Sequence, residues 1–386
     1  MAHVWRNRVT TGIAVQGDPP GRPYRVVLFV FFFVLLGAGY SVNAQEGIPA
    51  QVINTDQTVN AYVLPEESTG VLMLLNGGMQ ITALGRSMDN AWVKADLYNG
   101  IVGWVPYTQI ETGDAYALDT LPVTQPDEEM ILQYAPFWNF DTAQNRAIFE
   151  RGRAAGRTMN GFSKVGDSIT AAQMYLTPYG SGVYNLGEFE YLSHVLDYFG
   201  TDSSSSFGQR SVAVAVGWST RDVLNPNKAT AGCPLQMSPL VCEYNTRKPA
   251  FALIMLGTND ATVMDVAEFE ENLGLIVQTT IDADIVPVLS TVPPLLLPEW
   301  NERPYNYAII RVAQAYDVSL MNYWLAMQQL PNLGMSPDLI HPSTPPSNAG
   351  TTLFTGEYIQ YGYTMRNLVT LQGFDYLLRN SVYPTF

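Results

Sequence analysis

The second half of the chain alternates between short apolar runs and segments in which apolar residues recur at three- and four-residue intervals. The apolar runs lie at residues 161–166, 211–217, 250–257, 283–292 and 317–323. Such short runs, several rich in β-branched residues, are typical of buried parallel strands. The intervals between residues 269 and 277 and between 309 and 316 are those of amphipathic helices. The pattern predicts an α/β domain with a parallel sheet covered by helices on both faces.

Residues 48–112 have a different pattern, in which apolar and polar residues mostly mix or alternate in short segments divided by turn residues. The pair Asn99-Gly100 predicts a hairpin turn, because both residues accept positive φ. We therefore expect a small, half-open all-β barrel. Trp92 and Trp104 are candidate ligand platforms, although so small a barrel favours a place for them in its hydrophobic core.

Between these two regions, residues 113–130 carry two prolines and several acids without apolar periodicity, which indicates a linker. A helix is expected over 141–156, which begins with Asp and Thr and ends at Gly. The predicted domains are thus a barrel over 48–112 and an α/β domain over 131–386.

The N-terminus has the pattern of a secretory signal. Arginines precede an apolar run over residues 26–36, and Val-x-Ala follows, ending at Ala44. This order predicts a signal peptide over 1–44, cleaved after Ala44, and a secreted or cell-surface protein. An uncleaved anchor is the alternative, although the run is shorter than the roughly 18–20 residues that a membrane-spanning helix needs. Beyond this leader we expect no contact with a membrane.

Composition narrows the function classes. The 386 residues are 47% hydrophobic and 14% charged, with a net charge of −15. Without the four arginines and one aspartate that precede residue 45, there are 16 basic and 34 acidic residues, a net charge of −18. Such a chain repels phosphate backbones, which argues against nucleic-acid binding and suits a neutral or cationic substrate.

The two cysteines, Cys233 and Cys242, have eight residues between them. In an oxidising compartment this spacing favours a local disulfide that closes a loop. A zinc site is the weaker interpretation, since two thiols without neighbouring histidines do not complete a tetrahedral site. We predict no metal and no cofactor.

Four short blocks follow apolar runs of the α/β region, where ligands of parallel sheets bind. They are "GDS" (166–168), "GWST" (217–220), "GTND" (257–260) and "DLIHPS" (338–343). In kind and order these blocks resemble the SGNH, or GDSL-type, serine hydrolases, and the resemblance covers roughly residues 157–370. It implies a flavodoxin-like three-layer sandwich and an esterase activity.

The N-terminal region resembles the bacterial Src-homology-3-like module over nearly its full length. The matching segments are "NAYVLPEESTG", where that family has its first long loop, "AWVKADL", and the closing "NGIVGWV". This resemblance implies a binding or spacer module, often directed at cell-wall material.

The residues of the four blocks suit nucleophilic catalysis. Ser168 needs an adjacent base, because a free hydroxyl is a poor nucleophile. His341 is the candidate base, since His3 lies in the leader and His194 in a helix-like segment that favours a structural role. Asp338, three residues before His341, is placed to hold the imidazole Nδ1–H.

The family pattern maps the oxyanion donors onto the backbone N–H groups of Ser168 and Gly217 and the side-chain amide of Asn259. Asp167 and Asp260 are interpreted as scaffold residues that satisfy loop backbone groups.

Together these observations predict an exported serine esterase acting on acyl esters, acetyl or short-chain, of small molecules, carbohydrates or cell-wall polymers. An O-acyltransferase, and a non-catalytic wall-binding protein that keeps the hydrolase fold as scaffold, stay open as alternatives. The N-terminal module would have a cell-wall ligand.

Overall fold

The computed structural model describes residues 47–53, 56–114, 117–230 and 232–382. The predicted signal peptide, residues 1–44, lies outside the described residues.

An antiparallel sheet forms from the first of these residues. Its strands are β1 (Ile48–Val52), β2 (Val59–Tyr62), β3 (Val71–Leu75), β4 (Gln80–Arg86), β5 (Trp92–Tyr98), β6 (Ile101–Pro106) and β7 (Ile110–Glu111), in the order β3-β2-β6-β5-β4-β1-β7. The predicted hairpin joins β5 to β6, and Asn99 (φ 48°) and Gly100 (φ 83°) take the left-handed conformation it needs. The region is a small all-β unit, as expected, while its likeness to the Src-homology-3 module stays a prediction.

The two tryptophans of this unit differ in exposure. Trp104 on β6 is 3% exposed, which agrees with a packing role. Trp92 is half-buried and packs edge-to-face on Tyr62, with ring centroids 5.4 Å apart. One expectation needs correction: the segment assigned to the first long loop begins in a strand, because residues 60–62 belong to β2.

The expected linker, residues 113–130, contains ordered structure. A 3₁₀ turn at Leu118–Thr120 precedes an isolated bridge between Val123 and Arg86 of β4. Helix α1 (Glu128–Tyr134) begins inside the segment, and its N-cap Asp127 accepts a hydrogen bond from Met130 N. The domain boundaries proposed from the sequence stay predictions.

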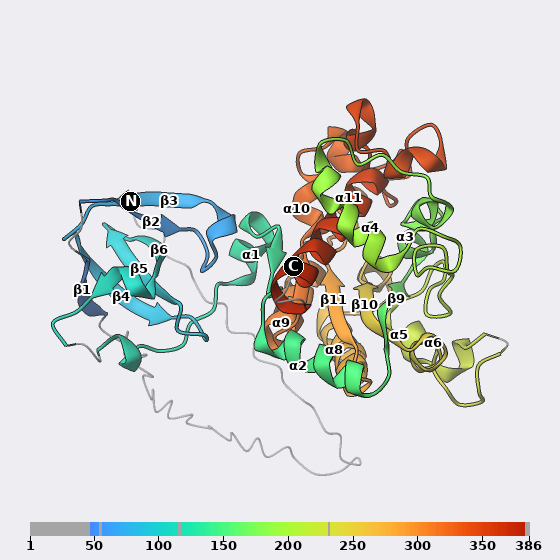
Figure 1. The fold of residues 1–386 in the computed structure, drawn as a ribbon, viewed down its shortest axis with the longest axis horizontal. Coiled ribbons are helices and arrows are strands. Elements are labelled where there is room, and N and C mark those ends of the chain that lie inside the picture. Colours follow the sequence, from blue (N-terminus) through green and yellow to red (C-terminus); the bar gives the residue numbers. More distant parts are fainter. Residues whose placement is uncertain (1–46, 54–55, 115–116, 231, 383–386) are drawn as a thin grey trace, which may run out of the picture. The chain divides into compact units, whose positions relative to one another are not determined.

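The second sheet has the order β8-β12-β11-β10-β9, and Figure 1 shows β9, β10 and β11 side by side within it. Its strands are β8 (Phe137–Trp138), β9 (Thr158–Gly166), β10 (Pro249–Met255), β11 (Val286–Ser290) and β12 (Ser319–Met321). Strands β9 to β12 are parallel, and the short β8 adds an antiparallel edge that the sequence pattern did not predict. The α/β class with a parallel sheet is confirmed.

One predicted strand is wrong. Residues 211–217 form no strand and meet the sheet only through an isolated bridge between Val214 and Gly166. The competing partners are side chains: Val212 N donates to Glu243 Oε2, and the Ser206 hydroxyl accepts from Phe162 N on β9. These bonds satisfy backbone groups that a β-ladder would otherwise use.

Helices cover both faces of this sheet. On one face, Phe149 of α2 (Ala143–Ala154), Phe199 of α4 (Ser193–Phe199) and Phe374 of α11 (Gly362–Tyr376) place their rings within 6.0 Å of the Phe251 ring of β10. The other face is covered by α6 (Pro239–Arg247), α8 (Val266–Asp282) and α9 (Arg303–Tyr316). The helices expected over 141–156, 269–277 and 309–316 are confirmed.

The remaining segments are short, and none of the helices described is long and apolar enough to cross a membrane. The other α-helices are α3 (Ser168–Ala171), α5 (Thr220–Leu224), α7 (Asp260–Val263) and α10 (Tyr323–Met327). Further 3₁₀ turns lie at Glu67–Thr69, Tyr107–Gln109, Thr177–Ser181, Gly187–Leu192, Pro226–Lys228, Pro331–Gly334, Asn348–Thr352 and Gly356–Gln360, and the chain continues from α11 into a π-helical turn at Leu377–Val382.

Candidate active site

Ser168 lies at the turn between β9 and α3, at the carboxyl edge of the parallel sheet. Gly166 is required there, because a Cβ at this position would come within 2.4 Å of Thr170 Oγ1 and 2.7 Å of Met255 O. Asp167 caps α3 by accepting a hydrogen bond from Ile169 N at 2.9 Å. Ser168 is consequently the first helical residue, half-exposed above a buried turn.

The structure brings Ser168, His341 and Asp338 together in a line. Ser168 Oγ lies 2.9 Å from His341 Nε2, and His341 Nδ1 lies 2.7 Å from Asp338 Oδ2. A carboxylate next to Nδ1 favours the tautomer with the proton on Nδ1, so that Nε2 is free to accept the serine proton. These distances are those that a serine nucleophile, its base and a group that orients the base require.

The carboxylate of Asp338 is held by its own loop. Its Oδ1 accepts hydrogen bonds from the Ser336 hydroxyl at 2.7 Å, Ile340 N at 3.0 Å and His341 N at 2.9 Å. Partial burial by itself would raise the pKa of Asp338, but the hydrogen bonds from His341, Ser336 and Ile340 hold that pKa well below its ordinary value. Asp338 is therefore a carboxylate at neutral pH.

The backbone of this loop is closed by two further bonds. Ser336 N donates to His341 O at 2.9 Å, and Leu296 N donates to Leu339 O at 3.1 Å. Leu339 has φ of 65°, a conformation that bulky residues rarely adopt. Strain of this kind persists only where the surrounding bonds over-determine the turn.

Two backbone N–H groups beside Ser168 are available to a ligand. The described part of the chain provides no hydrogen-bond acceptor for Ser168 N or for Gly217 N. Gly217 has φ of 76° and is exposed, so its glycine is explained by backbone conformation rather than by space.

The side chain of Asn259 supplies a third donor. Its Nδ2 donates one hydrogen to Trp218 O at 2.9 Å, which orients the amide. The Nδ2 group carries two hydrogens, so one remains for a ligand. The candidate oxyanion donors are thus one side-chain amide and two backbone N–H groups.

Asp260 connects two of the sequence blocks. Its Oδ1 accepts hydrogen bonds from Thr220 N at 2.8 Å and Thr220 Oγ1 at 2.6 Å, which joins the start of α5 to the start of α7. Asp167 supports the nucleophile turn in the same way and is fully buried, and this burial raises its pKa to about 6. The interpretation of both aspartates as scaffold residues is confirmed.

Arg366 of α11 also supports the nucleophile helix, and the sequence analysis missed it. This 3% exposed side chain donates to Ile169 O at 2.7 Å and to Thr170 Oγ1 at 2.8 Å, and lies 3.6 Å from the centroid of the Tyr175 ring. The sequence feature that could have identified Arg366 is its isolation: it is the only charged residue of this helical segment before Asp375.

The other sequence candidates lie apart from this arrangement. His194 Nδ1 is 2.8 Å from Tyr191 O and its Nε2 is 3.0 Å from Asp375 Oδ1, which confirms a structural role. The predicted disulfide between Cys233 and Cys242 is present. Among the residues that the structure covers, no group of three or more His, Cys, Asp and Glu side chains is arranged to hold a metal ion.

A comparison with known protein families found one match. The profile of the GDSL-like lipase/acylhydrolase family matches residues 165–345, which contain all four sequence blocks. Residues 165–345 form a GDSL-like lipase/acylhydrolase domain. The chain is accordingly a hydrolase of ester bonds. A search of curated proteins found no match.

Several solved structures are similar to part of the chain. A psychrotrophic esterase, EstA, from Pseudoalteromonas sp. is 17% identical, with 57% of this chain and 100% of that chain covered and a TM-score of 0.37. A lipase/acylhydrolase from Enterococcus faecalis is 19% identical, with 59% and 100% covered and a TM-score of 0.36. An acetylxylan esterase, Axe2, from Geobacillus stearothermophilus is 15% identical, with 60% and 98% covered and a TM-score of 0.36.

Proposed function

We propose that this protein is an exported serine esterase in which Ser168 is the nucleophile, His341 the general base and acid, and Asp338 the residue that orients His341. Its substrates are acetyl or short-chain acyl esters of carbohydrate or cell-wall polymers. The observation that carries the catalytic assignment is the continuous hydrogen-bonded line from Ser168 Oγ through both nitrogens of His341 to Asp338 Oδ2.

In the first half of the reaction, Ser168 Oγ attacks the ester carbonyl carbon while its proton moves to His341 Nε2. The carbonyl oxygen becomes an oxyanion, which the N–H groups of Ser168 and Gly217 and the amide of Asn259 stabilise. The imidazolium that forms is stabilised by Asp338, whose low pKa keeps it ionised. His341 then gives the proton to the leaving alkoxide oxygen, and the alcohol departs to leave an acyl-serine.

In the second half, water takes the place of the alcohol. His341 Nε2 accepts a proton from water as the water oxygen attacks the acyl carbon, and the same donors hold the second oxyanion. Collapse of this intermediate breaks the bond to Ser168 Oγ, which recovers its proton from His341. The carboxylic acid leaves and the site returns to its starting state.

The polymer assignment comes from two further considerations. The sequence pattern before residue 45 is that of a secretory signal, which would place the enzyme among extracellular polymers. The small all-β unit that precedes the hydrolase domain resembles a module often directed at cell-wall material, and it would hold the enzyme near such a substrate.

The test is hydrolysis of p-nitrophenyl acetate and butyrate by the full chain expressed in an exporting bacterial host and purified from the medium. We expect the exported protein to begin at Gln45 by mass spectrometry. Turnover should fall on the order of 10⁶-fold in Ser168→Ala. Acetylated xylan and acetylated peptidoglycan are then compared as polymer substrates by release of acetate.

Each part of the proposal has a result that contradicts it. Equal turnover by wild type and Ser168→Ala would refute the nucleophile, and retention of the chain in the cytoplasm would refute export. Release of acetate from neither polymer by an enzyme active on the p-nitrophenyl esters would refute the substrate class.

A further inference from the structure

A cavity of about 320 Å³ adjoins the nucleophile helix. Its walls include Thr170, two residues after Ser168 on α3, and Val214, three residues before Gly217. The wall also includes the polar side chains of Gln173, Gln209 and Ser211, together with Ala171, Ala172 and Gly208. Cavities that bind small ligands begin at about this volume.

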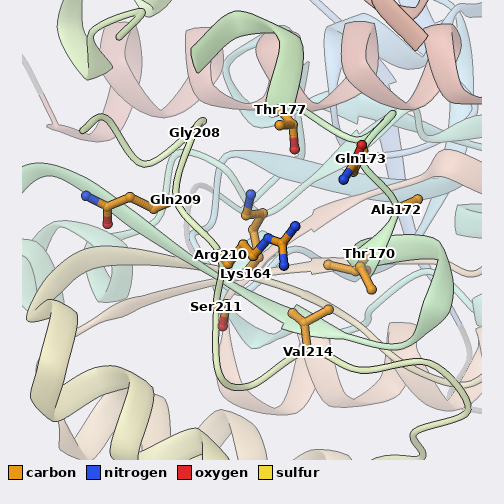
Figure 2. Close-up of a pocket in the computed structure, with 11 residues that line it drawn as sticks. Lys164, Thr170, Ala172, Gln173, Thr177, Gly208, Gln209, Arg210, Ser211 and Val214 are labelled. Atoms are coloured by element: carbon orange, nitrogen blue, oxygen red, sulfur yellow. The ribbon is translucent and has the colours of Figure 1, made fainter. Parts of the chain in front are cut away.

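Two cationic side chains also line the cavity. In Figure 2, Lys164 and Arg210 lie at the centre of the view, with Gln173 and Thr177 on one side and Ser211 and Val214 on the other. Lys164 belongs to β9 and is only 7% exposed, whereas Arg210 is exposed. Both therefore border the same space from different depths.

The ammonium of Lys164 is poorly satisfied. Its one hydrogen bond within the described residues goes to Phe207 O at 3.4 Å, although an ammonium has three donors. Arg210 forms no ion pair with any described carboxylate. Buried charges are normally paired, so an unpaired buried ammonium facing a cavity indicates a missing anionic partner.

Glu243 is the acid that raises the pKa of Lys164, and it already has other hydrogen-bond and ion-pair partners. Glu243 accepts hydrogen bonds from the Ser163 hydroxyl at 2.7 Å and from Val212 N at 2.8 Å, and lies 3.9 Å from Arg247 Nε. Burial lowers the pKa of Lys164 to about 8, with Glu243 opposing the shift and Arg366 and Arg247 adding to it. Lys164 is mostly charged at neutral pH, so the cavity is locally cationic.

We propose that this cavity binds a carboxylate carried on a hydroxylated, sugar-like group of the ester substrate. Lys164 and Arg210 would hold the carboxylate, and the amides and hydroxyls of Gln173, Gln209 and Ser211 would hydrogen-bond to ring hydroxyls. The identification of this ligand as part of an ester substrate rests on the proposed function. Binding to the cavity can be measured without ester hydrolysis.

This assignment revises an expectation from composition. The net charge of −18 without the leader suggested a neutral or cationic substrate, because an acidic chain repels anions. Lys164 and Arg210 place two positive charges on the wall of the cavity next to α3. We therefore expect an acidic sugar to bind in this cavity although the net charge of the chain is negative.

The test uses exported protein carrying Ser168→Ala, titrated in a calorimeter with D-glucuronate, D-glucose and inorganic phosphate. We expect D-glucuronate to bind at least tenfold more tightly than either of the others. Adding Arg210→Gln or Lys164→Met should weaken D-glucuronate binding at least tenfold each. Arg146→Gln, which changes an arginine of α2 outside the cavity wall, is the matched control and should bind as the parent does.

No binding of D-glucuronate, or equal binding by the parent and Arg210→Gln, would overturn the proposal. Tighter binding of phosphate than of D-glucuronate would overturn the assignment to a carboxylate. If Lys164→Met does not fold, Arg210→Gln still decides, because this side chain is exposed. An enzyme that binds D-glucuronate but hydrolyses no ester would refute the proposed function and leave the site intact.

Discussion

Two segments supply the candidate catalytic residues, and they are held in different ways. The nucleophile turn (residues 166–171) carries Ser168, and the histidine loop (residues 335–343) carries Asp338 and His341. The nucleophile turn is part of the core: Asp167 is fully buried and Arg366 of α11 fixes α3 from beneath. In the histidine loop the side chains of His341 and Asp338 are 37% and 51% exposed. The Asp338 carboxylate is held by hydrogen bonds from three residues of the same loop.

The pKa values of Asp167 and Asp338 are shifted in opposite directions, in line with this difference. Burial raises the pKa of Asp167 to about 6, whereas the hydrogen bonds to Asp338 hold its pKa well below the ordinary value. The buried turn holds Ser168 next to a poorly solvated acid. The exposed loop keeps Asp338 ionised, as the proposed mechanism requires when His341 becomes positive. Substitutions in the loop should therefore change activity more than stability, and those in the turn should change both.

The largest effect is expected for His341→Ala. Loss of the general base should lower kcat for p-nitrophenyl acetate roughly 10⁵- to 10⁶-fold. The melting temperature should change little, because the ring is partly exposed. His194→Ala is the control, since His194 pairs with Asp375 away from Ser168, and it should keep near-normal kcat. Comparable losses of activity in both variants would contradict the separation of roles.

Asp338→Asn should rank next, with kcat lowered about 10⁴-fold, because an amide donates to Nδ1 and favours the wrong tautomer of His341. Ser336→Ala removes one of the hydrogen bonds to Asp338 and should cost about tenfold or less. Steady-state kinetics of both variants measure this order. A larger loss in Ser336→Ala than in Asp338→Asn would show that loop order, and not His341 orientation, is what Asp338 supplies.

Asn259→Ala removes a donor that acts in the transition state. We expect kcat to fall about 10²- to 10³-fold with KM nearly unchanged. Thr262→Ala is a nearby control, because the Thr262 hydroxyl donates only to Asn259 O on the exposed side of α7. A rise in KM with unchanged kcat would place Asn259 in substrate binding instead.

The smallest effect should appear in the pH dependence of stability. Below about pH 4 both folded and unfolded chains hold the Asp167 proton, and between pH 4 and 6 only the folded chain keeps it. The free energy of unfolding of wild type, relative to Asp167→Asn, should therefore fall by on the order of 3 kcal/mol as pH rises through this range.

Asp338 should show the opposite sign. Its folded pKa is lowered, so its contribution to stability is present above the unfolded pKa and is lost as pH falls below it. Urea unfolding of wild type, Asp167→Asn and Asp338→Asn between about pH 2 and pH 7 compares the two regions directly, because it covers the ranges in which both contributions change. Parallel pH curves for the two variants would contradict the contrast between turn and loop.

The sequence predicted those features that local pattern determines. Apolar runs located β9 to β12. The resemblance of four ordered blocks to the SGNH hydrolases located Ser168, Asn259 and His341, and only the pairing of Asp338 with His341 followed from a short spacing along the chain. Residues 211–217 have the period of a strand, but their partners are Ser206 and Glu243, and only the tertiary structure brings those side chains to the sheet.

The contacts that support the candidate site were also hard to predict, because only the tertiary structure brings their partners together. Arg366 reaches α3 from 196 residues away in the chain, and Trp218 orients Asn259 through a backbone carbonyl that carries no sequence signal. Lys164 was visible as a cation inside an apolar run, yet its meaning depends on the cavity that it faces.

The central claim is that Ser168 is activated by His341, and covalent labelling tests it most directly. Exported protein is treated with a fluorophosphonate and digested, and the adduct is mapped by mass spectrometry. The account predicts one adduct, on Ser168, in wild type, with labelling strongly slowed in His341→Ala and absent in Ser168→Ala. An active wild-type enzyme labelled at another residue, or one labelled equally fast without His341, would contradict it.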